Sequence, residues 1–392
     1  MKDARWRVLA LYGAWNGLMQ FEWLRFAPIT DTVAAQYHMS ASEVGQLSLV
    51  FPLLFLPLAL PSGWLIDRRS ARFSLNLSAV LMTLGVALRA LAPNAAALLA
   101  GQTVLAIAQP LVMALISKLV GVWFAEDERL QATGLGTLSI FVGLGLAFLL
   151  VPPTAAGDVH ESLWVDVFAL AALLLATLLG VPKDSSLHAG TASSSPTLSW
   201  FAGLRTLLKS RLFAAILLLI FFANGYSNAI FTWLEPMLLP QGINATQAGI
   251  AGLLILAGGI LGMSLLPRMR DIEQGLRPLM LLVTGIGIPL TIVLLTSSHF
   301  IWVMLASFLI GALLLSPLPI FVDVVARLGG AALAGTAVSS FWLVGNAGAA
   351  AAIGVMSWVA DQQRWPLALW ILLGLLAVNF VIAGLLLRAS KA

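Results

Sequence analysis

Long apolar runs separated by short polar stretches dominate the pattern of this 392-residue chain. A helix needs about 20 apolar residues to cross the hydrocarbon layer of a bilayer. Twelve runs of this kind follow one another, near residues 9–34, 44–66, 73–92, 95–123, 130–152, 163–182, 212–239, 247–267, 278–297, 300–326, 333–359 and 366–388. They lack the alternating pattern of membrane β-strands. The pattern therefore predicts an all-α integral membrane protein with twelve transmembrane helices.

A polar segment between the sixth and seventh runs divides the predicted spans six and six. It is rich in serine and contains a Ser-Ser-Ser-Pro sequence at residues 193–196, which is typical of a linker. We therefore expect an N-terminal six-helix half over 1–182, a cytoplasmic linker over 183–199 and a C-terminal six-helix half over 200–392. Two six-helix halves around a central loop are typical of secondary transporters.

The composition agrees with a membrane protein. The chain is 60% hydrophobic and 10% charged, whereas a soluble domain carries about 25% charged residues. Its net charge of +4 reflects Lys and Arg at ends and loops that are cytoplasmic if the N-terminus is inside. We therefore expect a multi-pass protein of the cell (inner) membrane with both termini cytoplasmic. We expect membrane lipids as partners, no binding of nucleic acid, and a monomer.

Several kinds of chemistry are excluded by the residues that the chain lacks. It has no cysteine, which excludes disulfides, thiolate metal sites and cysteine nucleophiles. Its four histidines are scattered near predicted loops, so we expect no metal site and no cofactor. Neither a nucleotide-binding loop nor a nucleophile–base constellation is present. The sequence therefore favours neither a membrane enzyme nor a sensor.

The first apolar run contains two opposite charges on either side of a tryptophan, since residues 22–25 read Glu-Trp-Leu-Arg. A charge at bilayer depth costs at least about 2.5 kcal/mol on insertion scales, so it is kept mainly where it is paired or functional. On a helix, Asn16, Gln20 and Trp23 form one stripe at i, i+4 and i+7, which we expect to line a binding cavity. Glu22 and Arg25 lie off this stripe at i, i+3. They are predicted to pair with each other in a structural or gating role.

Other polar side chains interrupt the apolar runs of the fourth, seventh and eleventh predicted spans. A lone amide in a membrane helix is commonly an interhelical contact, and this alternative stays open for Gln102 and Asn16. Spacing and position nevertheless indicate a central polar pocket. Its expected substrate contacts, besides the stripe on the first span, are Gln109, Asn224, Tyr226, Trp342 and Asn346.

The loop between the second and third predicted spans carries a cluster of charges. Residues 63–73 resemble the G-x-x-x-D-R-x-x-x-R loop of the major facilitator superfamily. We expect Asp67, Arg68 and Arg72 to form a cytoplasmic charge relay there.

A further acid lies near the cytoplasmic end of the tenth predicted span. Asp323 is a candidate for gating or proton relay, and the alternative is an ion pair with Lys118 or Arg327.

Taken together, these residues resemble a more specific group, the feline leukaemia virus subgroup C receptor family of major facilitators. That family includes choline and ethanolamine transporters that are also described as haem exporters. The resemblance covers most of the chain. It is carried by Phe21-Glu22-Trp23, Ala108-Gln109, Ser117-Lys118, Val122-Trp123-Phe124, Leu318-Pro319 with Asp323, and Gly335-Thr336.

The resemblance implies roles for individual residues. Trp23 and Tyr226 look like the family's aromatic cage for a quaternary ammonium group. Gln109 matches a glutamine that binds the polar end of the substrate, and Asn346 falls on a second family glutamine. Glu22 replaces an uncharged residue.

Two charged positions of the family are also matched. Its glutamate in the tenth span falls on Asp323, and its arginine in the fourth span falls on Lys118.

The sequence thus predicts a secondary transporter that moves a small organic amine or quaternary ammonium solute, choline-like, by alternating access. Facilitated diffusion as a uniporter is favoured over proton coupling through Glu22 or Asp323. The alternative is a proton-coupled exporter of a hydrophobic or amphipathic compound, such as a drug-like cation or haem.

Overall fold

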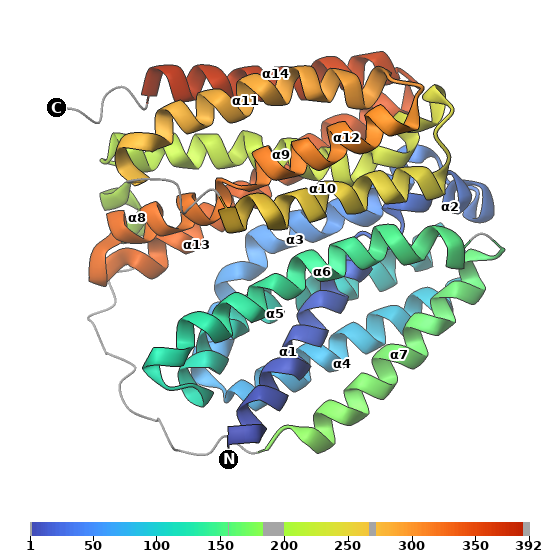
Figure 1. Cartoon of the computed structure of the whole chain (residues 1–392). Coiled ribbons are helices and arrows are strands. Elements are labelled where there is room, and N and C mark those ends of the chain that lie inside the picture. Colours follow the sequence, from blue (N-terminus) through green and yellow to red (C-terminus); the bar gives the residue numbers. More distant parts are fainter. Residues whose placement is uncertain (1, 156, 183–199, 266–271, 387–392) are drawn as a thin grey trace. The chain divides into compact units, whose positions relative to one another are not determined.

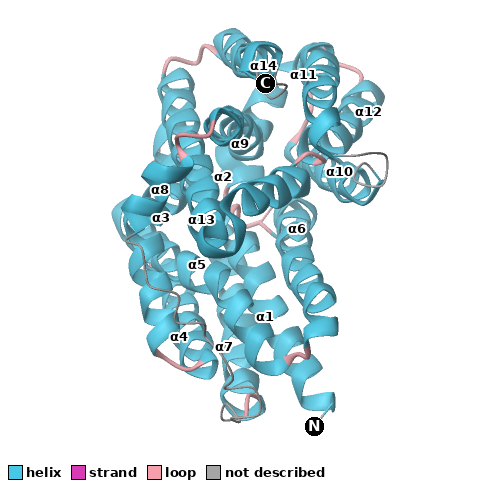
Figure 2. Cartoon of the chain, turned by 90° about the vertical axis from the view of Figure 1, so that its left-hand side faces the viewer, coloured by secondary structure: helices cyan, strands magenta, loops and turns pink. Residues whose placement is uncertain are grey.

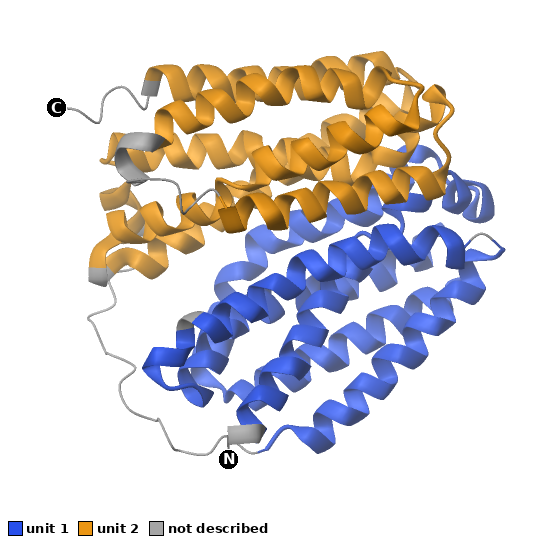
Figure 3. Ribbon diagram, in the orientation of Figure 1, with its two compact units in different colours: residues 1–192 blue, residues 193–392 orange. Residues whose placement is uncertain are grey.

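The computed structural model describes residues 2–155, 157–182, 200–265 and 272–386, and all regular elements within these ranges are helical (Figures 1 and 2). The chain divides into two compact units, residues 1–192 and 193–392 (Figure 3). The predicted linker, 183–199, lies outside the described residues.

The first unit consists of seven α-helices and two short 3-10 turns within its described residues. They are α1 (Lys2–Trp23), η1 (Ala27–Ile29), α2 (Thr30–Tyr37), α3 (Ala41–Arg68), α4 (Ala71–Ala90), α5 (Ala95–Trp123), η2 (Glu126–Glu128), α6 (Arg129–Thr154) and α7 (Val159–Gly180).

The second unit begins, within its described residues, with a short amphipathic helix. Its elements are α8 (Trp200–Leu207), α9 (Arg211–Leu238), η4 (Leu239–Gln241), α10 (Ala245–Leu265), α11 (Ile272–Thr296), α12 (Phe300–Ile310), a π-helical turn η6 (Gly311–Leu315), α13 (Leu318–Asp361) and α14 (Trp365–Leu386).

Eleven helical segments of the described chain are long and apolar enough to cross a membrane. The 22-residue helix α1, which is more polar, precedes them. The predicted fold class, an all-α membrane protein, is confirmed.

The first predicted run, 9–34, is not one helix. Helix α1 ends at Trp23, and the chain continues through η1 into the separate helix α2. Proline has no backbone N–H and its ring clashes with the preceding turn, so Pro28 is accommodated in the first turn of a new helical segment that begins at Ala27. The apolar character of the run continues across this break, and for that reason the sequence pattern predicts a single span.

The tenth and eleventh predicted spans are also divided differently. The tenth consists of α12, the π-helical turn η6 and the first part of α13, and the remainder of α13 forms the eleventh span. Pro317 precedes α13, and Pro319 lies in its first turn, where a missing N–H costs least. Gly330, with a φ of 56°, separates the two spans inside α13.

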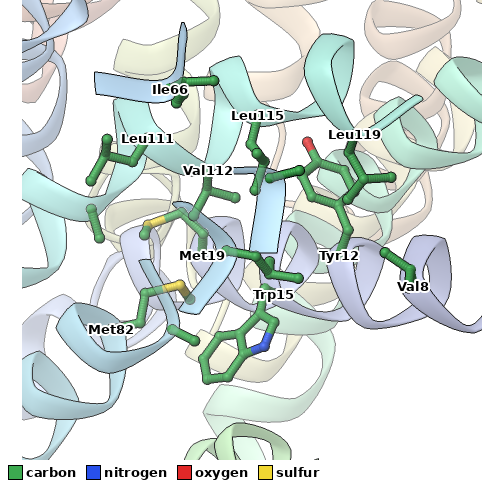
Figure 4. Close-up of a cluster of buried hydrophobic side chains, with 14 of the residues drawn as sticks. Val8, Tyr12, Trp15, Met19, Ile66, Met82, Leu111, Val112, Leu115 and Leu119 are labelled. Carbon is green, nitrogen blue, oxygen red and sulfur yellow. The ribbon is translucent and has the colours of Figure 1, made fainter. Parts of the chain in front are cut away.

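One face of α1 forms the centre of the core of the first unit (Figure 4). Its buried side chains follow helical spacing and pack against α5, with Met82 from α4 and Ile66 from α3 beside them. The indole N–H of Trp15 donates to Thr177 Oγ1 of α7 at 2.8 Å. The residues of α1 in this face are Val8, Tyr12, Trp15 and Met19.

Candidate functional site

Trp23, the last residue of α1, is held in a defined orientation. Its indole N–H donates to the backbone oxygen of Ser48 on α3 at 3.0 Å. The centroid of its ring lies 6.3 Å from that of the buried Phe51, at an interplanar angle of 42°. The side chain is half-buried. An oriented indole of this kind is suited to binding a cation over its face.

Two further members of the predicted pocket, Gln20 and Gln109, have polar atoms without a partner. Both residues are buried, at 2% and 4% exposure. Gln20 Nε2 and Gln109 Oε1 make no hydrogen bond within the described part of the chain. A buried polar group without a partner costs about 1–3 kcal/mol. One atom is a donor and the other an acceptor, so a hydroxyl group is chemically suited to both.

The amides of Asn16 and Asn224 lie between helices of their own units. Asn16 Nδ2 donates to Gly136 O at 3.1 Å and to Ser139 Oγ at 3.0 Å, both on α6. In the second unit, Asn224 Nδ2 donates to Gly345 O on α13 at 2.8 Å. The structure therefore gives both amides the interhelical role that the sequence left open for Asn16.

Glycines allow unusually close contact at the same two interfaces. A Cβ on Gly143 of α6 would lie 1.9 Å from Gly17 O of α1. A Cβ on Gly348 of α13 would likewise lie 1.9 Å from Phe221 O of α9. The same arrangement therefore occurs in both units: an Asn-Gly pair on the first long helix, α1 or α9, contacts a glycine on a neighbouring helix, α6 or α13.

Tyr226 points into the second unit. Its hydroxyl hydrogen-bonds to Thr291 Oγ1 of α11 at 2.6 Å. Its ring lines a small pocket of mostly apolar side chains. The other lining residues are Ser227, Ile230, Phe231, Ile255, Ile310, Leu314 and Leu315. Because Trp23 belongs to the first unit, the aromatic cage stays a prediction.

The remaining predicted contacts of the second unit lie on α13. Asn346 Nδ2 donates to Trp342 O of its own helix at 2.9 Å, and both residues are half-buried. The Trp342 ring packs edge-on against Phe341 at 5.4 Å between centroids.

Lys118 caps the C-terminal end of α3. From α5, its ammonium donates to Ile66 O at 2.5 Å, to Asp67 O at 3.2 Å and to Arg69 O. Carbonyls at a helix C-terminus carry partial negative charge, which a cation stabilises. The structure therefore joins Lys118 to the charged loop.

The arginines of this loop contact rings and backbone. The guanidinium of Arg68 lies 4.3 Å from the centroid of the Trp64 ring. Arg72 Nη2 donates to Leu178 O of α7 at 3.4 Å. A charge relay that includes Asp67 stays a prediction.

Replacing Lys118 with methionine is expected to lower stability by about 1.5–3 kcal/mol, because hydrogen bonds from a charged donor to the α3 carbonyls are lost. The measurement is thermal unfolding of the purified protein in detergent. The exposed Lys209 offers a matched control, since Lys209→Met removes the same charge from the surface. Equal midpoints for the two variants would contradict the capping role.

Asp323 is paired on the surface of its own helix. Its carboxylate lies 2.9 Å from Arg327 Nη2, one turn further along α13. The two side chains are 43% and 62% exposed, and such pairs contribute about 0–1 kcal/mol.

Glu22 and Arg25 do not pair with each other, and that prediction was wrong. Glu22 forms an ion pair with Arg89 of α4, whereas Arg25 Nε lies 2.7 Å from Asp166 Oδ2 of α7. The prediction assumed one continuous helix through both residues. Because α1 ends at Trp23, the i, i+3 geometry does not apply to Arg25.

Arg89 and Asp166 are not among the residues predicted from the sequence. Each is a charge within an otherwise apolar run, the third and the sixth. Because a charge within the membrane requires a partner, these two charges could have been predicted as the partners of Glu22 and Arg25.

These four residues, Glu22, Arg25, Arg89 and Asp166, form a charge array of zero formal charge. Their side chains are between 0% and 10% exposed. Polar neighbours extend the array: Arg89 Nη1 donates to Gln102 Oε1 at 2.9 Å, and Arg25 Nη2 donates to Ser162 Oγ at 2.8 Å. Gln102 Nε2 in turn donates to Leu47 O of α3 at 3.0 Å.

The chain is similar in sequence to a large protein family and to individual members of it. The model of the family described as Major Facilitator Superfamily matches residues 12–353. Solute carrier family 49 member A3 of Xenopus tropicalis is 30% identical over 277 residues, which is 66% of this chain and 57% of that protein. The human choline/ethanolamine transporter FLVCR2 is 25% identical over 280 residues, 66% of this chain and 53% of that protein.

The chain thus spans less than three-fifths of the length of these relatives. Among solved structures, an inward-facing bacterial homologue of the lysosomal transporter Spinster superposes with a TM-score of 0.74 at 15% identity. The match covers 100% of this chain and 98% of that one. At this identity the similarity concerns the fold.

Proposed function

The chain belongs to the major facilitator superfamily of transporters, and we propose that it moves a small organic amine or quaternary ammonium solute, choline-like, as a uniporter. Alternating access would expose the solute to each side of the membrane in turn. The solute crosses down its own electrochemical gradient in this proposal, without a coupled ion.

The observation that carries the proposal is the held indole of Trp23. A cation over a tryptophan face gains about 2 kcal/mol or more when it is desolvated. A quaternary ammonium group donates no hydrogen bond, so an aromatic face recognises it without leaving a polar atom unsatisfied. The unpartnered donor of Gln20 and acceptor of Gln109 suit the hydroxyl of the same solute.

The relatives support the same substrate class. The name of FLVCR2 states that it transports choline and ethanolamine, and its match covers 66% of this chain. We propose that Tyr226, Trp342 and Asn346 contribute the second unit's share of the site. The two six-helix halves, 1–182 and 200–392, would move against each other around it.

Location and gating are parts of this proposal. The positive-inside distribution supports an inner-membrane protein, monomeric, with both termini cytoplasmic. Lys118 with Asp67, Arg68 and Arg72 would act at an inner gate, and Asp323 at the inner end of the second unit. Lipids would surround the exposed apolar side chains.

A second candidate is a proton-coupled exporter of a hydrophobic or amphipathic compound. The apolar pocket beside Tyr226 favours this alternative, because its lining is dominated by isoleucine and leucine. Dependence of transport on a pH gradient separates the two candidates.

The test combines binding and transport. Purified protein is screened by thermal shift against choline, ethanolamine, betaine, amino acids, haem and drug cations, and hits are assayed for uptake into proteoliposomes. We expect stabilisation by choline or ethanolamine, and uptake that proceeds equally with and without a pH gradient. An absence of both shift and uptake for every amine would refute the substrate assignment.

A further inference from the structure

The charge array and Trp23 meet at one place, the end of α1. Glu22 precedes Trp23 in the last turn, and Arg25 follows it just beyond the helix. Their partners belong to two other helices, α4 and α7. The indole N–H of Trp23 instead donates a hydrogen bond to Ser48 O on α3. The end of α1 is therefore bound to three other helices, α3, α4 and α7.

We propose that Glu22 and Arg89 are positioning residues that set the rotation of this turn and thereby aim the Trp23 ring at a bound cation. The inference rests on the proposed function. Nothing in the resemblance implies it, since Glu22 occurs where the family has an uncharged residue.

The bonding of Arg89 explains why this pair is suited to the role. Its guanidinium donates to the carboxylate of Glu22, to the backbone oxygen of Glu22 and to Gln102 Oε1. Side chain and backbone of one residue are thus held by one rigid, planar group. Its carbon Cζ also lies 5.3 Å from the centroid of the Phe26 ring, just after the turn. A rotation of the last turn would break several of these contacts at once.

The burial of the array makes the constraint strong. The side chains of Glu22 and Arg89 are both fully buried, so water does not replace a lost partner. Arg25 and Asp166, with Ser162, fix the chain directly after the turn in the same manner. A cation–π contact depends on the position of the cation over the ring face, so a small rotation of the indole weakens it.

The experiment compares choline with its neutral carbon isostere, 3,3-dimethyl-1-butanol (dimethylbutanol below), in which carbon replaces the charged nitrogen. The ratio of the two affinities reports the cation–π contact and is insensitive to a general loss of stability. We use the charge-balanced double variant Glu22→Gln/Arg89→Gln, because it leaves no unpaired buried charge. We expect the ratio to fall at least about tenfold, with little change for the isostere.

A matched control lies at the other end of the same helix. Arg5 donates to both carboxylate oxygens of Glu128, at 2.5 and 2.6 Å. At about 1.5 Å per residue, Arg5 is about 27 Å from Trp23 along the helix axis. Arg5→Gln/Glu128→Gln removes the same two charges and is expected to keep the wild-type ratio.

A second variant protects the test against misfolding. Arg89→Lys keeps the charge but loses the planar fork, and it is also expected to lower the ratio. A wild-type ratio in a folded Glu22/Arg89 double variant or in Arg89→Lys would overturn the inference and leave the proposed function intact. A wild-type protein with no preference for choline over the isostere would refute both.

Discussion

Gly143→Ala and Gly348→Ala are each expected to destabilise the protein by about 3 kcal/mol, the upper part of the range for overpacking. In both cases the added Cβ would lie 1.9 Å from a backbone oxygen of the neighbouring helix. A backbone atom cannot rotate away as a side chain does, so α6 must separate from α1, or α13 from α9. The measurement is the thermal unfolding midpoint and the yield of monodisperse protein in detergent.

Each helix also supplies its own control. A Cβ on Gly134 of α6 or on Gly354 of α13 would meet no atom within 4 Å. Alanine at these positions gains helix propensity of about 0.8–1.0 kcal/mol, so the controls are expected to be neutral or stabilising. Equal loss of stability at the contact and control glycines would contradict the close contacts of α6 with α1 and of α13 with α9.

The same two alanine substitutions are expected to weaken the hydrogen bonds of the asparagines beside the glycine contacts. Separation of α1 from α6 would also lengthen the hydrogen bonds from Asn16 to Gly136 and Ser139. In the second unit, separation of α13 from α9 in Gly348→Ala would likewise lengthen the hydrogen bond from Asn224 to Gly345. Asn16 and Asn224 therefore hold their helices at the spacing that these glycines allow.

Much of the fold was predictable because membrane helices have a strong sequence signal. Apolar length located the spans, since every backbone polar group in lipid must be satisfied within a helix. The breaks within spans were less predictable. The break after α1 is accompanied by Pro28, and α12 passes into a π-helical turn, and neither feature changes the apolar character of the sequence.

The partners of buried charges were the largest omission. Sequence spacing suggested the nearest opposite charge, whereas the structure joins Glu22 to Arg89 and Arg25 to Asp166, with separations of 67 and 141 residues. Pairing over such distances depends on which helices are neighbours, and the first span's own periodicity carries no information about that. The stripe of Asn16, Gln20 and Trp23 was inferred from local spacing alone, and α1 does extend through all three residues.

The Trp23 series tests the proposed site most directly. Trp23→Ala is expected to weaken choline binding at least about 30-fold, because a desolvated cation–π contact contributes about 2 kcal/mol or more. Trp23→Phe keeps an aromatic face, although a weaker one, and loses the hydrogen bond to Ser48 O. It is therefore expected to retain much of the affinity that alanine loses. Isothermal titration in detergent gives both values.

The order of the three affinities separates the possible roles of this residue. A cation–π site predicts tryptophan above phenylalanine, and phenylalanine far above alanine. If Trp23 served only to anchor α1 to α3 through its N–H, phenylalanine and alanine would lose binding equally, and dimethylbutanol would lose as much as choline. Equal losses would therefore refute the cation–π site, because only the face of the ring distinguishes a charged ligand from its neutral isostere.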